Sequence, residues 1–179
     1  MRTNSYINAQ QRQRGAALVV ALIMLLVMTV LGITAMQMTR MEERMAGNSR
    51  DVNLAFQGAE AGLRDSETLI AAMTTRPTTC AATPCAIWLR GTWTTDPRDE
   101  AYSWWTTNGV EYGVAGTQEV TEVTRDPVVV TESLGFVPDS LSVGHGPPEG
   151  RDFYKITANS SGASDTATAV LESTYTRRF

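Results

Sequence analysis

Charge is missing from one long stretch near the start of this 179-residue chain. No charged residue lies between Gly15 and Thr39. A helix of about 25 residues is long enough to span the ~30 Å hydrocarbon core of a bilayer. A buried core helix is the alternative, but apolar runs in soluble cores seldom exceed roughly 18 residues. We therefore predict a membrane-spanning segment over residues 16–39, preceded by a short basic segment over residues 1–15.

Acidic residues are missing from that basic segment, so the net charge of −4 is unevenly distributed. Arg2, Arg12 and Arg14 precede the apolar run, and the acidic excess follows it. Positive flanks stay on the cytoplasmic side of a membrane. The pattern predicts a cytoplasmic N-terminus and an exported remainder. An acidic exported part does not favour nucleic-acid binding, which uses basic patches.

Cysteine and histidine are scarce, with two cysteines, Cys80 and Cys85, and one histidine, His145. Both cysteines fall on the predicted exported side, where disulfides form. We predict a disulfide that closes a small loop, and two separate thiols are the alternative. A zinc site would need two more soft ligands, which this sequence hardly offers.

Catalytic and nucleotide-binding motifs are also missing. The sequence has no GxGxxG, no P-loop and no G-x-S-x-G elbow. His145 lies in a predicted loop, without a second histidine to build a site. Glu42 and Glu43 are neighbours, and neighbours on a helix point about 100° apart, so they form a solvated face rather than an acid–base couple. Three acidic residues near the predicted loop match no recognised calcium pattern: Asp139, Glu149 and Asp152. We expect neither an enzyme nor a cofactor.

The apolar run does not resemble a cleaved secretory signal, because it is about twice the usual length and no A-x-A site follows it before Arg40. Apolar residues instead continue at helical spacing, with one polar exception: Met38, Met41, Met45, Asn48, Val52, Ala55, Ala59 and Leu63. Glu60 and Arg64 have the favourable i,i+4 order. We predict one helix from about Ala16 to about Met73, ended ahead of Pro77. Its second half, residues 40–76, is amphipathic and packs on its own domain.

The last part of the chain, residues 77–179, is rich in β-formers. We predict strands at 102–105, within 111–123, and at 128–131, 153–158 and 168–175. A loop is predicted over 134–150 and a turn over Asn159–Gly162. An antiparallel sheet packed on the amphipathic helix gives an α+β fold. Four clustered tryptophans favour core packing over a surface patch for a partner: Trp88, Trp93, Trp104 and Trp105.

These features together resemble the lollipop-shaped type IV pilins. The run from Gln13 to Val20 is similar to a prepilin processing site, where a membrane peptidase cuts after the glycine and methylates the new N-terminus. Carried over, the cut falls between Gly15 and Ala16. Four segments are similar to the PilX-type minor pilins: Met41–Asp51, Ala55–Arg64, Phe153–Ala158 and Leu171–Tyr175. The resemblance covers residues 12–75 and 152–176.

The resemblance implies a non-enzymatic minor pilin that takes part in priming type IV pilus assembly. Its implied partners are other minor pilins, the major pilin, the prepilin peptidase, the inner-membrane assembly platform and a large tip adhesin. It implies the inner membrane before assembly, and the periplasm or pilus tip afterwards. One alternative is a pseudopilin of a type II secretion system, although its tip subunit usually carries a large inserted domain. Another is a single-pass membrane-anchored binding or enzymatic protein that keeps residues 1–15.

Two positions depart from the family pattern. Most pilins have glutamate as the fifth residue of the mature chain, where this sequence has Val20. That glutamate is thought to meet the N-terminal amine of the adjacent subunit, and only the tip subunit tolerates its loss freely. Val20 thus predicts a position at or near the filament tip; the alternative is a lipid-facing residue in a protein that enters no filament. Many pilins also have a proline near Gln37, whereas Gly32 is the only weak point here.

Overall fold

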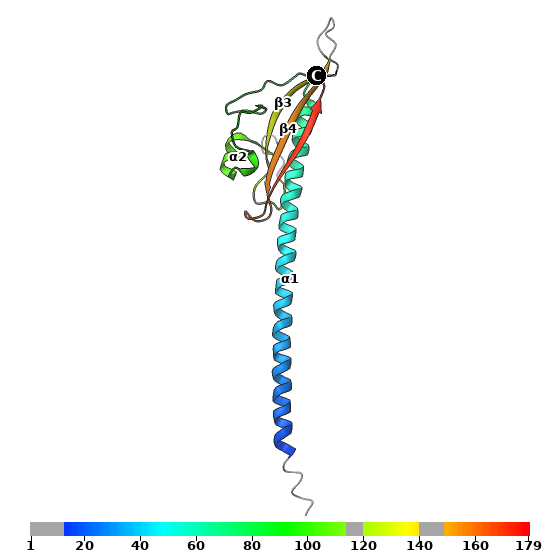
Figure 1. Ribbon diagram of the computed structural model, residues 1–179, viewed down its shortest axis with the longest axis vertical. Helices are drawn as coiled ribbons and strands as arrows, with labels where there is room; N and C mark the ends of the chain where they lie inside the picture. The colour runs from blue at the N-terminus through cyan, green and yellow to red at the C-terminus, as the bar shows by residue number, and fades with distance from the viewer. Residues whose placement is uncertain (1–12, 114–119, 140–148) are drawn as a thin grey trace, which may run out of the picture. The chain divides into compact units, whose positions relative to one another are not determined.

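The computed structural model describes residues 13–113, 120–139 and 149–179. Helix α1 runs without a break from Gln13 to Ala72 (Figure 1). The prediction of one long helix ending before Pro77 is confirmed. The chain divides into two compact units, residues 1–47 and 48–179. The first contains the apolar part of α1, and the second contains the rest of α1 and the sheet.

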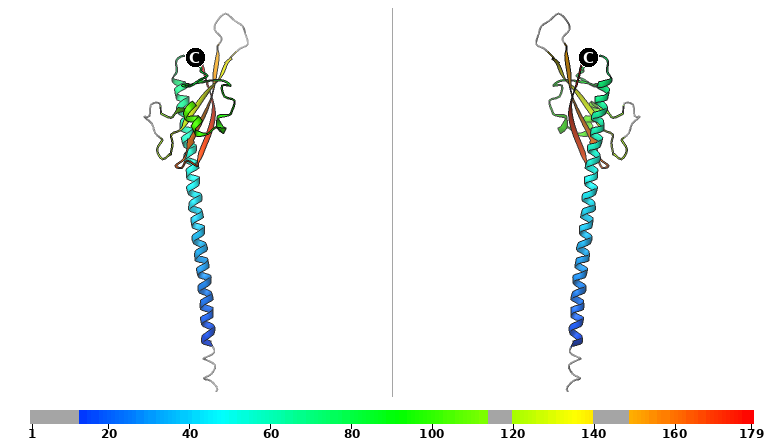
Figure 2. Two further views of the ribbon diagram at one scale, coloured as in Figure 1. Left: turned by 90° about the vertical axis from the view of Figure 1, so that its left-hand side faces the viewer. Right: turned by 90° about the vertical axis from the view of Figure 1, so that its right-hand side faces the viewer.

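The second unit is built on five strands: β1 (Trp88–Leu89), β2 (Val110–Glu111), β3 (Val128–Pro138), β4 (Gly150–Ser161) and β5 (Thr168–Arg177). The sheet has the order β1-β3-β4-β5, and β2 also pairs with β3. The long strands β3, β4 and β5 are antiparallel and lie beside the last turns of α1 (Figure 2). The α+β class is confirmed, but the sheet is mixed, because β1 pairs with β3 in parallel.

Strand alternation divides the core between the two faces of this sheet. Val129 contacts α1 residues, whereas Val128 and Val130 contact the tryptophans of the segment between α1 and β3. The α1 side buries a set of apolar residues: Ala59, Leu63, Ile70, Ile87, Val129, Tyr154, Ile156 and Ala158. The sheet is therefore covered on one face by α1 and on the other by the tryptophan-rich segment and helix α2 (Tyr102–Asn108) (Figure 1).

The strand predicted at 102–105 is wrong, because these residues begin helix α2. The aromatic content favours a strand locally, but a helix places Tyr102 and Trp105 on one side. Trp105 is fully buried, and Tyr102 packs beside it against the sheet. A 3₁₀ turn over Pro97–Asp99 leads into this helix.

The turn predicted at Asn159–Gly162 is also wrong in its position, since β4 continues to Ser161. Ser161 Oγ accepts a hydrogen bond from the Arg125 backbone N–H at 3.0 Å. Ser160 is fully buried beside α1. The Ser160 hydroxyl donates to the Ser161 carbonyl at 3.2 Å, so both serine hydroxyls have hydrogen-bond partners.

The loop predicted over 134–150 is wrong at both of its ends. β3 extends to Pro138 and β4 begins at Gly150. A bulge between Ser133 and Gly135 keeps the pairing going, and Gly135 takes a positive φ of 108° there. His145 and residues 140–148 lie outside the described residues. Of the strand predicted within 111–123, only Glu111 is in a strand, and residues 114–119 are not described.

The contact between α1 and the sheet depends on two glycines of the helix. A Cβ on Gly58 would meet the hydroxyl of Ser160 and would lie 3.2 Å from its Cβ. A Cβ on Gly62 would lie 3.0 Å from Val129 Cγ2. Ala55 and Ala59 of the same helix are also fully buried. Small residues on one face of α1 therefore let the helix backbone approach the strands closely.

We predict that Gly58→Ala lowers the free energy of unfolding by about 1–3 kcal/mol, because the added methyl group overpacks the contact with Ser160. The measurement is urea unfolding of the full-length protein in detergent, followed by tryptophan fluorescence. Gly47→Ala is the control, since no atom lies within 4 Å of a Cβ there. Helix propensity alone should make this control neutral or stabilising by up to about 1 kcal/mol. Equal stabilisation by both variants would contradict the close approach.

Candidate functional site

The apolar part of α1 is the first candidate functional surface. This helix is long and apolar enough to cross a membrane. Its large side chains are all exposed in the isolated chain: Leu18, Val19, Val20, Leu22, Ile23, Met24, Leu25, Leu26, Val27, Met28, Val30, Leu31, Ile33 and Met36. Covering such a surface is favourable by roughly 25 cal/mol per Å² of apolar area. The segment therefore fits lipid or other apolar helices as its surroundings.

Three threonines interrupt this apolar stretch without leaving unsatisfied polar groups. Thr29, Thr34 and Thr39 each donate their hydroxyl to a backbone carbonyl three or four residues earlier, at 2.8–3.2 Å. Such internal bonds satisfy the hydroxyl where water is absent. The threonines are thus compatible with a membrane environment.

The residues predicted for leader cleavage and for helix packing at the filament tip all lie on α1. Gly15 and Ala16 fall in its first turns, and Val20 follows one turn later with 56% of its surface exposed. The helix continues unbroken through Gly32, where an added Cβ would meet no atom within 4 Å. Val20 and Gly32 are therefore open to neighbouring molecules.

The predicted helical stripe is only partly buried by this chain. Ala55, Ala59 and Leu63 pack on the sheet. Met41 and Met45 are 66% and 69% exposed, and Val52 is half-exposed. Exposed apolar side chains of α1 therefore continue past the charge-free stretch, among charged residues.

The second unit contains a polar contact that the sequence did not reveal. The carboxylate of Asp51 accepts hydrogen bonds from the Ser164 backbone N–H, at 3.0 Å, and from its hydroxyl. A Cβ on Gly162 would collide with Asp51, so the turn between β4 and β5 needs glycine there. The Ser164 hydrogen bonds hold the pKa of Asp51 below its ordinary value, against a smaller opposing effect of burial.

The same turn is held from its other side by Arg125. Its guanidinium pairs with Asp165 at 2.6 Å and lies over the ring of Tyr102, 4.2 Å from the ring centre. The Thr124 backbone N–H donates to the Gly162 carbonyl at 2.8 Å. The turn is therefore fixed between α1 and the chain segment that leads into β3.

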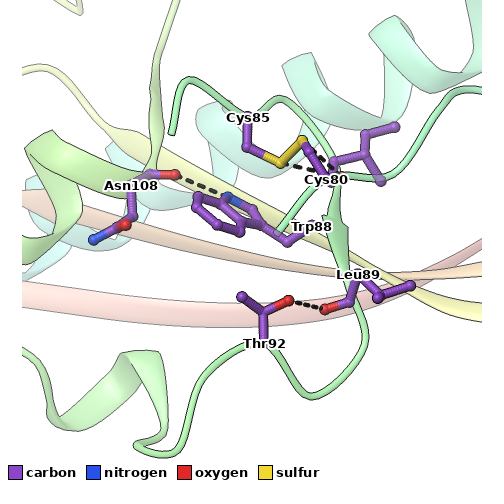
Figure 3. The surroundings of a disulfide bond; sticks show 7 residues. Cys80, Cys85, Trp88, Leu89, Thr92 and Asn108 are labelled. Carbon is purple, nitrogen blue, oxygen red and sulfur yellow. Dashed lines mark hydrogen bonds between the residues drawn. A yellow bond between two sulfur atoms is a disulfide. The ribbon is translucent and has the colours of Figure 1, made fainter. Parts of the chain in front are cut away.

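Cys80 and Cys85 form a disulfide next to the tryptophan cluster (Figure 3). The backbone of Cys80 accepts from the Leu89 N–H at 2.9 Å, and the Trp88 indole donates to the Asn108 carbonyl at 3.0 Å. Trp88 and Trp105 are buried. The disulfide loop and helix α2 thus enclose a small second core over the sheet.

Trp93 and Trp104 remain half-buried at the edge of this second core. Their ring centres are 5.2 Å apart in an edge-to-face arrangement, and each also contacts a buried tryptophan. Core packing accounts for Trp88 and Trp105, while the two outer rings are also accessible from solution. No group of His, Cys, Asp or Glu side chains within the described ranges is arranged to hold a metal ion.

An apolar cavity of about 310 Å³ lies beside the short strands β1 and β2. Its lining comes from the last turns of α1, from the chain around β1 and β2, and from β3: Asp65, Ser66, Leu69, Ile70, Met73, Ala86, Ile87, Val110, Glu111, Tyr112, Val129 and Thr131. Sequence patterns did not indicate it, because its walls come from segments that are far apart in the chain.

Comparison with protein-family models decides the family. The model described as PilX N-terminal matches residues 14–64, and the model described as type IV pilus assembly protein PilX C-term matches residues 65–177. The chain belongs to the PilX family of type IV pilus assembly proteins. No curated protein and no solved structure matches it.

Membership in the PilX family relates the exposed apolar surface of α1 to the type IV pilus. A PilX-family minor pilin is a structural protein that works with other components of the type IV pilus. Its long apolar helix anchors it to a membrane. The resemblance noted from the processing site and the Met41–Asp51 run is thus confirmed at the level of the family.

We predict that the Asp51–Ser164 contact makes the stability of this PilX-family protein depend on pH. Because the Ser164 hydrogen bonds hold the pKa of Asp51 below its ordinary value, the carboxylate contributes stability at neutral pH. That contribution is lost as the pH falls through the folded-state pKa. Asp51→Asn removes the contribution at every pH. We expect a lower urea midpoint at about pH 7, and a smaller further loss between about pH 5 and pH 3 than in the wild type.

The control for this measurement is Glu43→Gln, which changes an exposed carboxylate on the same helix. It should leave the urea midpoint and its pH dependence unchanged. If Asp51→Asn and the wild type lose stability in parallel as the pH falls, Asp51 does not stabilise the turn through its charge.

Proposed function

We propose that this minor pilin primes type IV pilus assembly and sits at or near the filament tip. Before assembly, residues 16–39 hold it in the inner membrane with its N-terminus in the cytoplasm. The prepilin peptidase removes residues 1–15, and Ala16 becomes the methylated N-terminus. The apolar helix then joins those of other minor pilins and the major pilin, and the assembly platform extends this starter stack.

The proposed tip position rests on one observation: Val20 stands where most pilins have glutamate. A free amine enclosed among apolar helices must be neutralised, since a lone buried charge costs several kcal/mol. The family glutamate at the fifth mature position supplies that neutralisation for the adjacent subunit. Val20 has no charge to offer, so it suits the one subunit that has no subunit above it.

The exported unit supports a role in ordering subunits. Residues 48–179 form a compact α+β unit with two cores, one under α1 and one under the tryptophans. Such a unit can contact other minor pilins and a large tip adhesin through its strands and loops. These contacts would be non-covalent.

The processing step is tested by the mass of the N-terminal peptide from the membrane fraction. We expect a mature chain that begins at N-methylated Ala16. Gly15→Leu is the matched variant, because it changes only the residue before the cut, and we expect it to stay uncut and unassembled. A wild-type chain that begins at or near Met1 would mean a permanently anchored membrane protein, and the filament role would fall with it.

The tip position is tested with Val20→Glu in a chain carrying an epitope tag in its exported part. The variant should insert and support piliation at the wild-type level, because it restores the glutamate that the family uses. Gold labelling should find the wild type at filament tips and the variant also along the shaft. Val27→Glu is the control, since a carboxylate two turns deeper costs about 2.5–3.5 kcal/mol without a partner.

Two results would count against the tip position. If Val20→Glu inserts into the membrane but abolishes assembly, this chain does not tolerate the family glutamate at position 20, and the charge balance at the N-terminal amine does not explain Val20. If the wild type labels the shaft as often as the tip, the missing glutamate does not set the position of the subunit.

A further inference from the structure

One asparagine of the chain is followed directly by glycine, and this pair, Asn108–Gly109, lies at the end of helix α2. Such a pair is prone to deamidation. The main-chain nitrogen of the glycine attacks the side-chain carbon Cγ of the asparagine, a cyclic succinimide forms, and the amide nitrogen leaves with the N–H proton as ammonia. Water then opens the ring to aspartate or isoaspartate, so the reaction needs no oxidant or reductant. Glycine favours it because no side chain shields the attacking nitrogen.

The fold requires glycine at position 109. A Cβ there would collide with Val128 Cγ1 of strand β3. It would also lie 2.8 Å from the Trp105 carbonyl oxygen and 3.1 Å from the Val129 carbonyl oxygen. Backbone atoms in a closely packed interior have little room to move aside. The reactive pair is therefore a consequence of the close approach between the end of α2 and β3.

Three hydrogen bonds hold the pair in an unreactive arrangement. The Gly109 N–H donates to the Trp105 carbonyl at 2.7 Å, which engages the proton of the attacking nitrogen. Asn108 Nδ2 donates to the Trp104 carbonyl at 2.9 Å and so holds the side chain over the preceding turn. The Trp88 indole donates to the main-chain carbonyl of Asn108 at 3.0 Å (Figure 3). Because the side chain and the following peptide must rotate toward each other for attack, all three bonds oppose the reaction.

The bond from Trp88 depends on a segment about 20 residues away in the chain. Trp88 is buried in the second core and belongs to β1, which pairs with β3. The neighbouring Leu89 N–H donates to the Cys80 carbonyl at 2.9 Å, and the disulfide joins Cys80 to Cys85. The second core must therefore open locally before Trp88 releases Asn108, and local opening costs free energy.

We propose that Asn108 is a site of spontaneous deamidation that the closed second core protects. Each opening that releases Trp88 exposes the pair to reaction. The product does not restore the closed state, because an aspartate has lost the amide donor to the Trp104 carbonyl and places a negative charge beside the carbonyl end of α2. Isoaspartate also lengthens the main chain by a methylene group. The modification is thus a lasting record of the time that the second core has spent open.

The test is the rate of deamidation of the full-length protein in detergent at neutral pH. Trypsin releases residues 99–125 as a peptide whose only asparagine is Asn108. Mass spectrometry follows the conversion of amide to acid in this peptide, and a urea-unfolded sample gives the rate of the unprotected pair. The folded wild type should react at least about tenfold more slowly than the unfolded chain, the factor that three hydrogen bonds supply.

The part played by Trp88 is tested with Trp88→Phe, which removes the indole donor and keeps an aromatic ring in the second core. Deamidation of the folded protein should become about 2- to 10-fold faster, the factor for one lost hydrogen bond. The rate of the urea-unfolded chain should not change. Trp93→Phe is the matched control, because it removes an indole of the same cluster that is not the donor to Asn108. It should leave the folded rate at the wild-type level.

The lasting effect of the modification is tested with Asn108→Asp, which installs the aspartate product. This variant should have a lower urea midpoint than the wild type in tryptophan fluorescence. Asn53→Asp is the control, since it makes the same change at an exposed position of α1. Its midpoint should equal that of the wild type.

Two results would overturn the protection of Asn108. One is a folded wild type that deamidates as fast as the unfolded chain, and this comparison decides even if Trp88→Phe does not fold. The other is a folded Trp88→Phe that reacts no faster than Trp93→Phe. A wild-type urea midpoint for Asn108→Asp would overturn the lasting effect. None of these measurements depends on pilus assembly or on the tip position.

Discussion

The close contact between α1 and the sheet is the constraint on which the second unit, residues 48–179, depends. Gly58 and Gly62 bring the helix backbone against Pro127, Val129 and Ser160. At that separation the longer side chains of α1 reach the buried face of the strands. Asp51 and Glu67 of the helix also come within hydrogen-bonding distance of Ser164 and Ser173. A larger residue at either glycine would move the helix outward, and the core and the polar contacts would weaken together.

The same helix also carries a surface that its own chain cannot cover. From Leu18 to Met45 its apolar side chains are exposed, and its threonines satisfy their own hydroxyls. A surface of this size is stable only in lipid or against other helices. The apolar part of α1 therefore requires lipid or other apolar helices around it, which agrees with the place of this chain among the type IV pilus assembly proteins.

The second unit, residues 48–179, is asymmetric. One face of its sheet is covered by α1, and the other is covered by the disulfide loop and the tryptophans. The β3 side carries short strands and a bulge, whereas β5 keeps a full-length edge. Among the described long strands, β5 is therefore the one whose outer backbone groups no strand pairs with along its length.

The sequence by itself determined the features that depend on near neighbours in the chain. The absence of charge from Gly15 to Thr39 and the helical spacing beyond it were sufficient for α1. Alternation was sufficient for the centres of β4 and β5, although their ends were misplaced. Only the tertiary structure decided that Trp105 lies in a helix, because its burial against Val128 and Val130 outweighs the local preference of aromatic residues for strands. The Asp51–Ser164 contact joins residues 113 positions apart, and the open edge of β5 depends on which strands pair. Both follow from packing between distant segments, which periodicity and composition do not encode.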